Sequence, residues 1–437
     1  MLSFLAKRGG FARIFGGSVL SQGLLSATNL LAGLILVRRA PQAQYGYYVL
    51  IMSAVPLLAQ LQSSFINPIL QSQVIVAGVD QRRNFIGGLL REQRVLMLVV
   101  AAASLLFCII AWASSALTSA HAVIFVLGVL AAVAWLFREF FRMVLISYRR
   151  PYDVLRGDAA FSVILIGGIW LATLTMAPAI FAAVSIVTAA AVGGWLLSRH
   201  LRRHDPWNID GSPGALAQTV RVGAWAAAGA GIHWLFTQGY TFIVAAQLDV
   251  SAVASIAATR LMLSPLGVFS LGIAAMMYST STLWLKNHGA RGLLRRVLLF
   301  ALAMVLITIT YLIVMWLTRD WIFAHVIKKV YPDRDLLLGI WSLIFLCTVI
   351  RDQVIFLLIA HGRWRQLAVM TAVCAALGLS VSFIGIQHLG AAGGLLGLLA
   401  GEVAHVLGVF LLTYRDMRAG NESALVPVEM VPPELEL

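Results

Sequence analysis

The stretch FGGSVLSQGLLSATNLLAGLILV, at residues 15–37, decides the fold because its 23 positions hold no charged side chain. A helix needs about 20 apolar residues to cross the roughly 30 Å of hydrocarbon in a bilayer. Three basic residues precede the stretch and no small-residue cleavage site follows it, so we interpret it as an uncleaved first membrane span rather than a signal peptide. These basic residues are Lys7, Arg8 and Arg13.

Stretches of similar length and character recur along the rest of the chain. Of the 437 residues, 60% are hydrophobic and 11% are charged, whereas soluble proteins contain about 25% charged residues. We therefore predict an all-α integral membrane protein with about 12 transmembrane helices. Their ranges are 15–37, 47–77, 95–117, 122–147, 158–176, 178–198, 222–246, 251–285, 297–318, 336–360, 367–387 and 391–414.

The basic residues between the spans predict the orientation of the chain. Alternate segments place 22 Lys and Arg residues on the side of the two termini and six on the other side. Cytoplasmic loops carry the excess of Lys and Arg, so we expect both termini in the cytoplasm. The net charge of +14 is thus explained by membrane topology, and a nucleic-acid partner is not expected.

The two halves of the chain resemble each other. Pro56 and Pro265 both lie early in a long span, and an Arg-acid pair follows two spans later in each half, as Arg138-Glu139 and Arg351-Asp352. Such a parallel repeat predicts two six-helix lobes, as in many transporters, with the binding site at their interface. We assign residues 1–205 and 206–418 to the lobes, and residues 419–437 to an acidic, Pro-containing disordered tail.

Neutral polar side chains form one stripe on each of the first two spans. The first stripe has a spacing of four, four and three residues, which places its members on one helix face. The stripes could supply interhelical hydrogen bonds or line a hydrated cavity, and we favour the cavity because the stripes run through most of each span. The candidate substrate contacts among them are Gln22, Asn29, Gln60 and Asn67.

Ionisable residues inside spans predict function because they are costly in lipid. The two Arg-acid doublets are interpreted either as structural ion pairs or as a gate, with Arg138 and Arg351 paired within each lobe or crosswise between lobes. Arg260 has no acid within a helical turn of its own span. It could pair with another helix, or serve as the anion site near the middle of the membrane.

Three further charged or titratable residues are candidates. Arg38 and His233 could contact substrate, and Glu402 could couple transport to a proton or a cation. Asp158 lies at the edge of its predicted span. A face of small residues spaced by four, Gly393, Gly397, Gly401 and His405, predicts close packing of the last span against a neighbouring helix.

The sequence shows no constellation typical of an enzyme. Nucleotide-binding, nucleophile-elbow and zinc-protease motifs do not occur in it. The three cysteines, Cys108, Cys347 and Cys374, lie inside apolar stretches without metal-ligand spacing. We therefore expect neither a metal nor another cofactor.

Three stretches of the sequence indicate a family: VRRAPQAQYGYYVL at residues 37–50, AVASIAATRLMLSP at residues 252–265, and YPDRDLLLGIW from residue 331 together with LLIAHGRW from residue 357. They resemble the polysaccharide-transporter flippases of the multidrug, oligosaccharidyl-lipid and polysaccharide exporter superfamily. With the layout of six plus six spans, the resemblance covers essentially the whole chain.

The resemblance implies alternating access and an undecaprenyl-diphosphate-linked oligosaccharide as substrate, such as an O-antigen or exopolysaccharide repeat unit. It also implies a place in the bacterial cytoplasmic (inner) membrane, with membrane lipids and polysaccharide polymerase machinery as partners. Arginine suits such a diphosphate because its planar fork donates bidentate hydrogen bonds.

There are two alternatives, one from the same superfamily and one from another class of protein. A cation-coupled multidrug and toxin extrusion antiporter would have the same superfamily fold, but it normally carries a coupling carboxylate in its first lobe, where only Glu139 and Asp158 are candidates. A membrane-embedded polymerase or ligase would need a large outer loop, and the longest outer loop here spans only residues 319–335.

Overall fold

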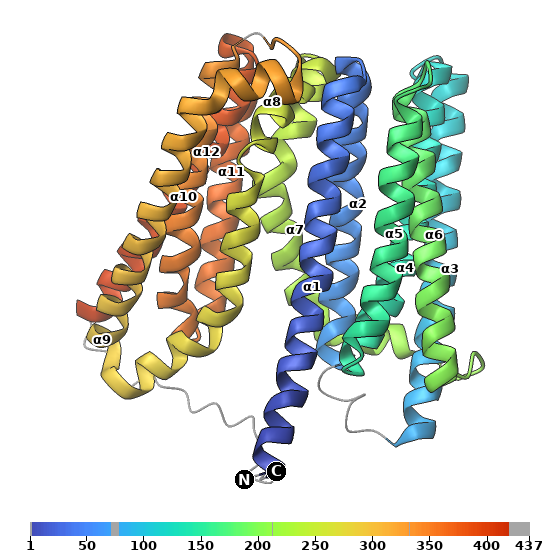
Figure 1. Cartoon of the computed structure of the whole chain (residues 1–437), viewed down its shortest axis with the longest axis vertical. Helices are drawn as coiled ribbons and strands as arrows, with labels where there is room; N and C mark the ends of the chain where they lie inside the picture. Colours follow the sequence, from blue (N-terminus) through green and yellow to red (C-terminus); the bar gives the residue numbers. More distant parts are fainter. Residues whose placement is uncertain (1, 71–77, 212, 332, 419–437) are drawn as a thin grey trace. The chain divides into compact units, whose positions relative to one another are not determined.

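The computed structural model describes residues 2–70, 78–211, 213–331 and 333–418, and these residues form helices joined by short turns (Figure 1). The predicted tail, 419–437, lies outside the described residues. The helices are α1 (Leu2–Arg39), α2 (Gln42–Ile69), α3 (Val79–Ala113), α4 (Ser119–Ser147), α5 (Pro151–Ala172), α6 (Pro178–His204), α7 (Ala215–Gln247), α8 (Val250–Leu261), α9 (Ser264–Trp321), the π-helix η2 (Ile322–Ile327), α10 (Arg334–Ala360), α11 (Trp364–Leu389) and α12 (Ala391–Arg418).

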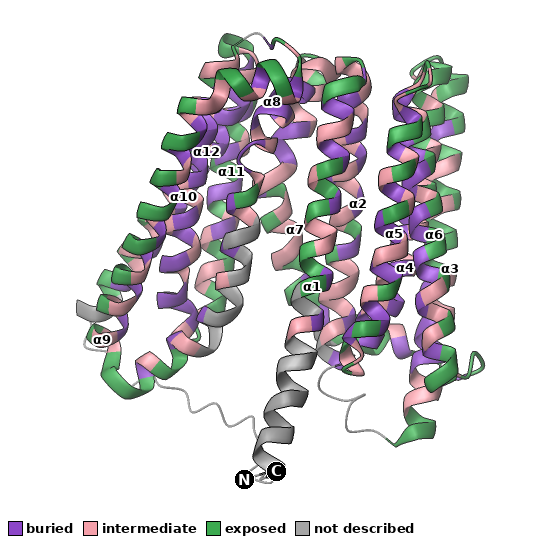
Figure 2. Cartoon of the chain, in the orientation of Figure 1, coloured by how far each residue is buried: buried purple, intermediate pink, exposed green. Residues whose placement is uncertain are grey.

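The observed helices account for the predicted membrane spans. Ten are long and apolar enough to cross a membrane, namely α1 to α6, the second part of α9, and α10 to α12. Helix α7 and the pair formed by α8 and the first part of α9 correspond to the other two predicted spans. The outer side of α3 exposes a row of large apolar residues, as expected of a helix that faces lipid (Figure 2).

The eighth and ninth spans differ from their prediction. We expected an uninterrupted span at 251–285 and a loop at 286–296. Instead α8 ends at Leu261 and α9 begins at Ser264, with Pro265 in its first turn, where the missing N–H costs nothing. The expected loop is helical except at Gly289, whose φ of 66° breaks the helix. Leu293 is fully buried there and belongs to the hydrophobic core of unit 2, so this basic segment packs against the unit through an apolar side chain.

The chain forms two compact units, each with its own core. Unit 1 comprises Met1–Trp234, Asp249–Ala257 and Val326–Lys329, and unit 2 comprises Leu235–Leu248, Ala258–His325 and Val330–Leu437. Most of α7 packs with unit 1, where Gly223 allows it to approach the backbone of Phe65 on α2. The boundary at 205/206 remains a prediction about the repeat, because it was drawn from sequence similarity and the units are defined by packing.

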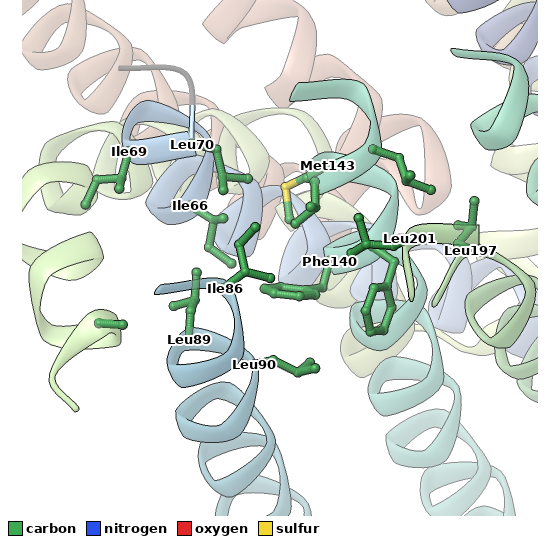
Figure 3. Close-up of a cluster of buried hydrophobic side chains, with 14 of the residues drawn as sticks. Ile66, Ile69, Leu70, Ile86, Leu89, Leu90, Phe140, Met143, Leu197 and Leu201 are labelled. Carbon is green, nitrogen blue, oxygen red and sulfur yellow. The ribbon is translucent and has the colours of Figure 1, made fainter. Parts of the chain in front are cut away.

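In unit 1, α4, α5 and α6 pack side by side, and one end of the unit is closed by a hydrophobic cluster (Figures 1 and 3). The cluster brings together side chains from α2, α3, α4 and α6 (Figure 3), among them Ile66, Leu89, Phe140 and Leu201. All four are 2% exposed or less, so this end of the unit is rigidly packed.

In unit 2, α11 and α12 pack at glycines. A Cβ atom added to Gly393 would lie 2.1 Å from the backbone of Gly385, and one added to Gly397 would lie 2.2 Å from the Ser382 hydroxyl. Only a hydrogen at these positions permits the observed approach. The packing role predicted for the glycine face of the last span is therefore confirmed.

Candidate functional site

Unit 1 contains a buried charge cluster centred on Asp158, which is 0% exposed. Arg138 and Arg142 reach it from α4, Arg138 through Nη2 and Arg142 through Nε, the latter at 3.2 Å from Oδ2. The Ser21 hydroxyl on α1 donates to the second carboxylate oxygen. Glu139 accepts from Arg142 Nη1 at 3.2 Å and completes the cluster. Three helices are thus joined by charge-assisted hydrogen bonds in the interior of the unit.

A further hydrogen bond joins α1 and α5 beside this cluster. Thr28 Oγ1 donates to Ser162 Oγ at 2.8 Å, and Ser162 in turn donates to the backbone oxygen of Asp158 at 2.8 Å. Ser21 and Thr28 are seven residues apart, so they lie on one face of α1. This buried face was not predicted, although the spacing of Ser21 and Thr28 could have indicated it.

Unit 2 contains a corresponding cluster centred on Arg351. Its Nη1 donates to Glu402 Oε1 at 2.6 Å, and its Nη2 donates to Asp352 Oδ1 at 2.9 Å. The Ser270 hydroxyl donates to Asp352 at 2.8 Å. The guanidinium also lies over the ring of Phe236, 5.8 Å from its centroid. Arg351 and Glu402 are 5% and 2% exposed, so their charges are compensated within the unit.

Both doublet arginines therefore pair with acids of their own unit, which is one of the two arrangements we predicted. The expectation that Asp158 lies at the edge of its span is wrong: α5 begins at Pro151, so Asp158 lies two turns inside the helix. Glu402, considered for cation coupling, is the ion-pair partner of Arg351. A gating role for Arg138, Glu139, Arg351 and Asp352 remains a prediction.

Arg260 lies in the last turn of α8, within unit 2, and is partly exposed. Its Nη1 donates to Gln238 Oε1 at 3.2 Å, and its guanidinium lies over Trp341, 5.3 Å from the ring centroid. In the part of the chain that the structure describes, no carboxylate lies within ion-pair distance of Arg260. An amide and an aromatic face orient the guanidinium without neutralising its charge.

The predicted polar stripes lie mostly at the surface of unit 1. Gln22, Asn29 and Gln60 are exposed, and Asn67 is half-buried. Gln22 Oε1 lies 3.4 Å from Arg142 Nη2, so the first stripe touches the edge of the Asp158 cluster. The stripes therefore provide exposed amide groups beside the buried charges.

Two predicted contact residues lie elsewhere in unit 1. Arg38 is exposed at the end of α1, next to Arg39, which stacks on Trp170 at 3.7 Å. His233 is exposed on α7. The described residues contain no group of three or more His, Cys, Asp or Glu side chains that could hold a metal ion, and the three cysteines are free.

Known structures share this fold. A multidrug-resistance MATE family transporter of the MOP superfamily, solved inward-facing, matches with a TM-score of 0.73 and 15% identity over 92% of this chain and 96% of that chain. The outward-facing conformation of a multidrug-resistance MATE transporter of this superfamily matches with a TM-score of 0.62 and 14% identity over 95% and 96%. The eukaryotic MATE transporter AtDTX14 matches with 0.60 and 13% over 97% and 100%.

No protein-family model matches the sequence, and no curated protein matches it. Identities of 13–15% show the fold alone. The chain is thus an all-α, multi-pass membrane protein with the two-lobed, roughly twelve-helix fold of MATE transporters, which confirms the predicted fold class.

Proposed function

We propose that the protein is an alternating-access transporter that moves undecaprenyl-diphosphate-linked oligosaccharides, of the O-antigen or exopolysaccharide kind, from the cytoplasmic to the outer leaflet. We place it in the bacterial cytoplasmic membrane, where it would deliver repeat units to polysaccharide polymerase machinery. The fold supports the transport mechanism, since solved structures with this fold include one inward-facing and one outward-facing conformation.

The environment of Arg260 carries the proposal of an anionic substrate. A cation on an apolar helix is costly, and the described residues supply it with an amide and an indole ring but no carboxylate. A diphosphate would provide the missing negative charge and accept hydrogen bonds from the planar guanidinium. The exposed amides Gln22, Asn29 and Gln60 are suitable partners for sugar hydroxyl groups.

A cation-coupled multidrug antiporter is the second candidate, because the fold neighbours are multidrug transporters and each unit has a carboxylate that is 2% exposed or less, Asp158 in unit 1 and Glu402 in unit 2. Both carboxylates, however, accept hydrogen bonds from arginine: Asp158 from Arg138 and Arg142, and Glu402 from Arg351. At Asp158 a cation would have to displace a guanidinium, because both carboxylate oxygens accept hydrogen bonds from arginine, whereas Glu402 accepts from Arg351 through Oε1 alone. This pairing favours the anionic substrate over a cationic drug.

The test combines deletion with variants of Arg260 in cells that produce one lipid-linked repeat unit. Leaflet-resolved mass spectrometry should show repeat units accumulating on the inner leaflet in the deletion strain and in Arg260→Gln. Arg260→Lys should restore partial transport, because lysine keeps the charge and loses the bidentate fork. Immunoblots establish equal amounts of each protein in the membrane.

The exposed Arg38 at the end of α1 is the second arginine to test, because it too was predicted to contact substrate. If Arg260→Gln exports at the wild-type rate while Arg38→Gln does not, the anion site lies at Arg38 and not at Arg260. Proton-driven efflux of a cationic dye by the purified protein, without movement of the lipid-linked unit, would establish the antiporter instead.

A further inference from the structure

A basic pocket of about 420 Å³ lies in unit 1, at the end predicted to be cytoplasmic. It is formed where α4 turns into α5 and where α6 ends, beside the hydrophobic cluster of Figure 3, against which Tyr148 packs. The pocket is lined by Arg82, Ser147, Tyr148, Arg149, Arg150, His204 and Asp205.

The lining is electrostatically unbalanced. It contains three arginines and a single carboxylate, Asp205, which Arg82 and Arg83 already share at 2.7 and 2.6 Å. Arg150 lies 3.6 Å from Asp153. For Arg149, the structure records no side-chain hydrogen bond or ion pair among the described residues, so its charge has no acidic partner there.

The backbone of Arg149 is in the left-handed region, with φ of 55°. Its N–H donates to Ile146 O at 2.9 Å, and the next N–H donates to Leu145 O at 3.0 Å, a helix-ending turn that normally has glycine at this position. Non-glycine residues adopt this conformation at an energetic cost.

Unit 2 contains the same turn with the expected glycine. Gly362 follows Arg351 by eleven positions, as Arg149 follows Arg138, and its φ is 68°. Its N–H donates to Ile359 O at 2.9 Å, and the following N–H donates to Leu358 O at 3.0 Å. The turn therefore does not require arginine, and the strained residue occurs only in the copy of the turn that borders the basic pocket.

We propose that this pocket binds a phosphate group, with Arg149 as its main cation and Arg82 and Arg150 as further donors. Burial, followed by the charge of Asp205, raises the pKa of Tyr148, so its hydroxyl stays protonated beside that acid. The pocket lies at the end of the α4 span, where we expect the lipid headgroups. The inference is independent of the proposed transport substrate.

The experiment measures lipid binding to the full-length protein in detergent by native mass spectrometry. Dioleoyl phosphatidylglycerol is the probe, and dioleoyl phosphatidylcholine is the lipid without net charge. Arg149→Gly and Arg149→Gln should each weaken phosphatidylglycerol binding by about tenfold, the loss expected for one charge-assisted contact. The matched control is Arg365→Gln, which removes one exposed charge from the first turn of α11.

Thermal unfolding separates a binding role from a structural one. Arg149→Gly should melt at or above the wild-type temperature because glycine relieves the left-handed strain, and yet it should bind less lipid. Displacement of the lipid by soluble glycerol phosphate would identify a free phosphate compound as the ligand, and failure to displace would identify the headgroup. Equal phosphatidylglycerol binding by wild type and both Arg149 variants overturns the proposal.

Discussion

At the scale of single residues, Asp158 joins three helices of unit 1. Its two carboxylate oxygens accept hydrogen bonds from side chains on α1 and α4, while the residue itself belongs to α5. Removing one member of such a buried group leaves the other charges without compensation. The loss of stability should then exceed the value of any single hydrogen bond.

We predict that Asp158→Asn lowers the free energy of unfolding by about 3–5 kcal/mol, because it leaves Arg138 buried without its main counter-charge. Unfolding in mixed micelles with increasing dodecyl sulfate measures this. Asp80→Asn, at a side chain that is 95% exposed, is the control and should have no measurable effect. The double variant Arg138→Met/Asp158→Leu should recover much of the loss, and an unchanged stability of Asp158→Asn would refute the central role of this acid.

The sequence identified the two doublet arginines but not the acid that pairs with Arg138. Arg138 and Arg351 could be identified because a charged side chain inside a membrane span is energetically costly and therefore indicates a partner or a function. Asp158 was not recognised as the partner of Arg138 because the predicted span began seven residues after the observed start of α5. A fully buried carboxylate was therefore interpreted as a residue at the edge of the span. Pro151, a favoured residue in the first turn of a helix, was the available signal.

At the scale of elements, two of the helix pairs show different ways of packing. Helices α11 and α12 meet through glycines, whereas α1 and α5 meet through the hydroxyl groups of Thr28 and Ser162. Close approach needs small residues at regular spacing, which the sequence displays. Cross-helix hydrogen bonds between residues 134 positions apart have no such local signature.

We predict that Gly397→Ala destabilises the protein by about 1–3 kcal/mol, because the new methyl group would overlap Ser382 and force α11 and α12 apart. The same unfolding measurement should find Gly167→Ala neutral or slightly stabilising, since a Cβ atom there meets nothing within 4 Å. Equal effects of the two substitutions would show that general helix propensity, and not close packing, explains the glycines.

We also predict that the exposed polar stripes contact water. In a protein without native cysteines, Gln22→Cys, Asn29→Cys and Gln60→Cys should react with a small water-soluble thiol reagent, and the half-buried Asn67→Cys should react more slowly. Thr28→Cys is the buried control, and Val163→Cys, on α5 at 72% exposure, is the control for a side chain exposed to lipid. Reaction no faster than that of Val163→Cys would show that the stripes face lipid or a packed helix.

At the scale of the whole molecule, the predicted duplication relates the positions of the two doublet arginines but not the acids that pair with them. The separation that aligns Arg138 with Arg351 aligns Asp158 with Thr371 and Glu402 with Ala189. Each unit therefore supplies its acid from a different helix, α5 in unit 1 and α12 in unit 2. A comparison of the two half-sequences could therefore locate both clusters, but it could not identify the acids that pair with the arginines.

The orientation of the whole chain is open to a direct test. Alkaline phosphatase, which is active only outside the cytoplasm, should be active when fused after Leu117 or Ala177 and inactive when fused after Arg150 or Gly362. Within unit 1, Leu117 and Ala177 lie in turns at one end of the helices and Arg150 lies in a turn at the other end, and Gly362 lies in the turn between α10 and α11 of unit 2. The reverse pattern, with equal amounts of fusion protein, would contradict the orientation assigned from the basic residues.

The placement of the acids also has a consequence for biosynthesis. Asp158 follows Arg138 by 20 residues, on the very next helix, so a nascent chain can neutralise that arginine almost as soon as it leaves the ribosome. Glu402 follows Arg351 by 51 residues, and α11 is made in between. Until α12 is synthesised, only the adjacent Asp352 can offset the charge of Arg351 on α10. We therefore expect the insertion of α10 into the membrane to be slower than that of α4.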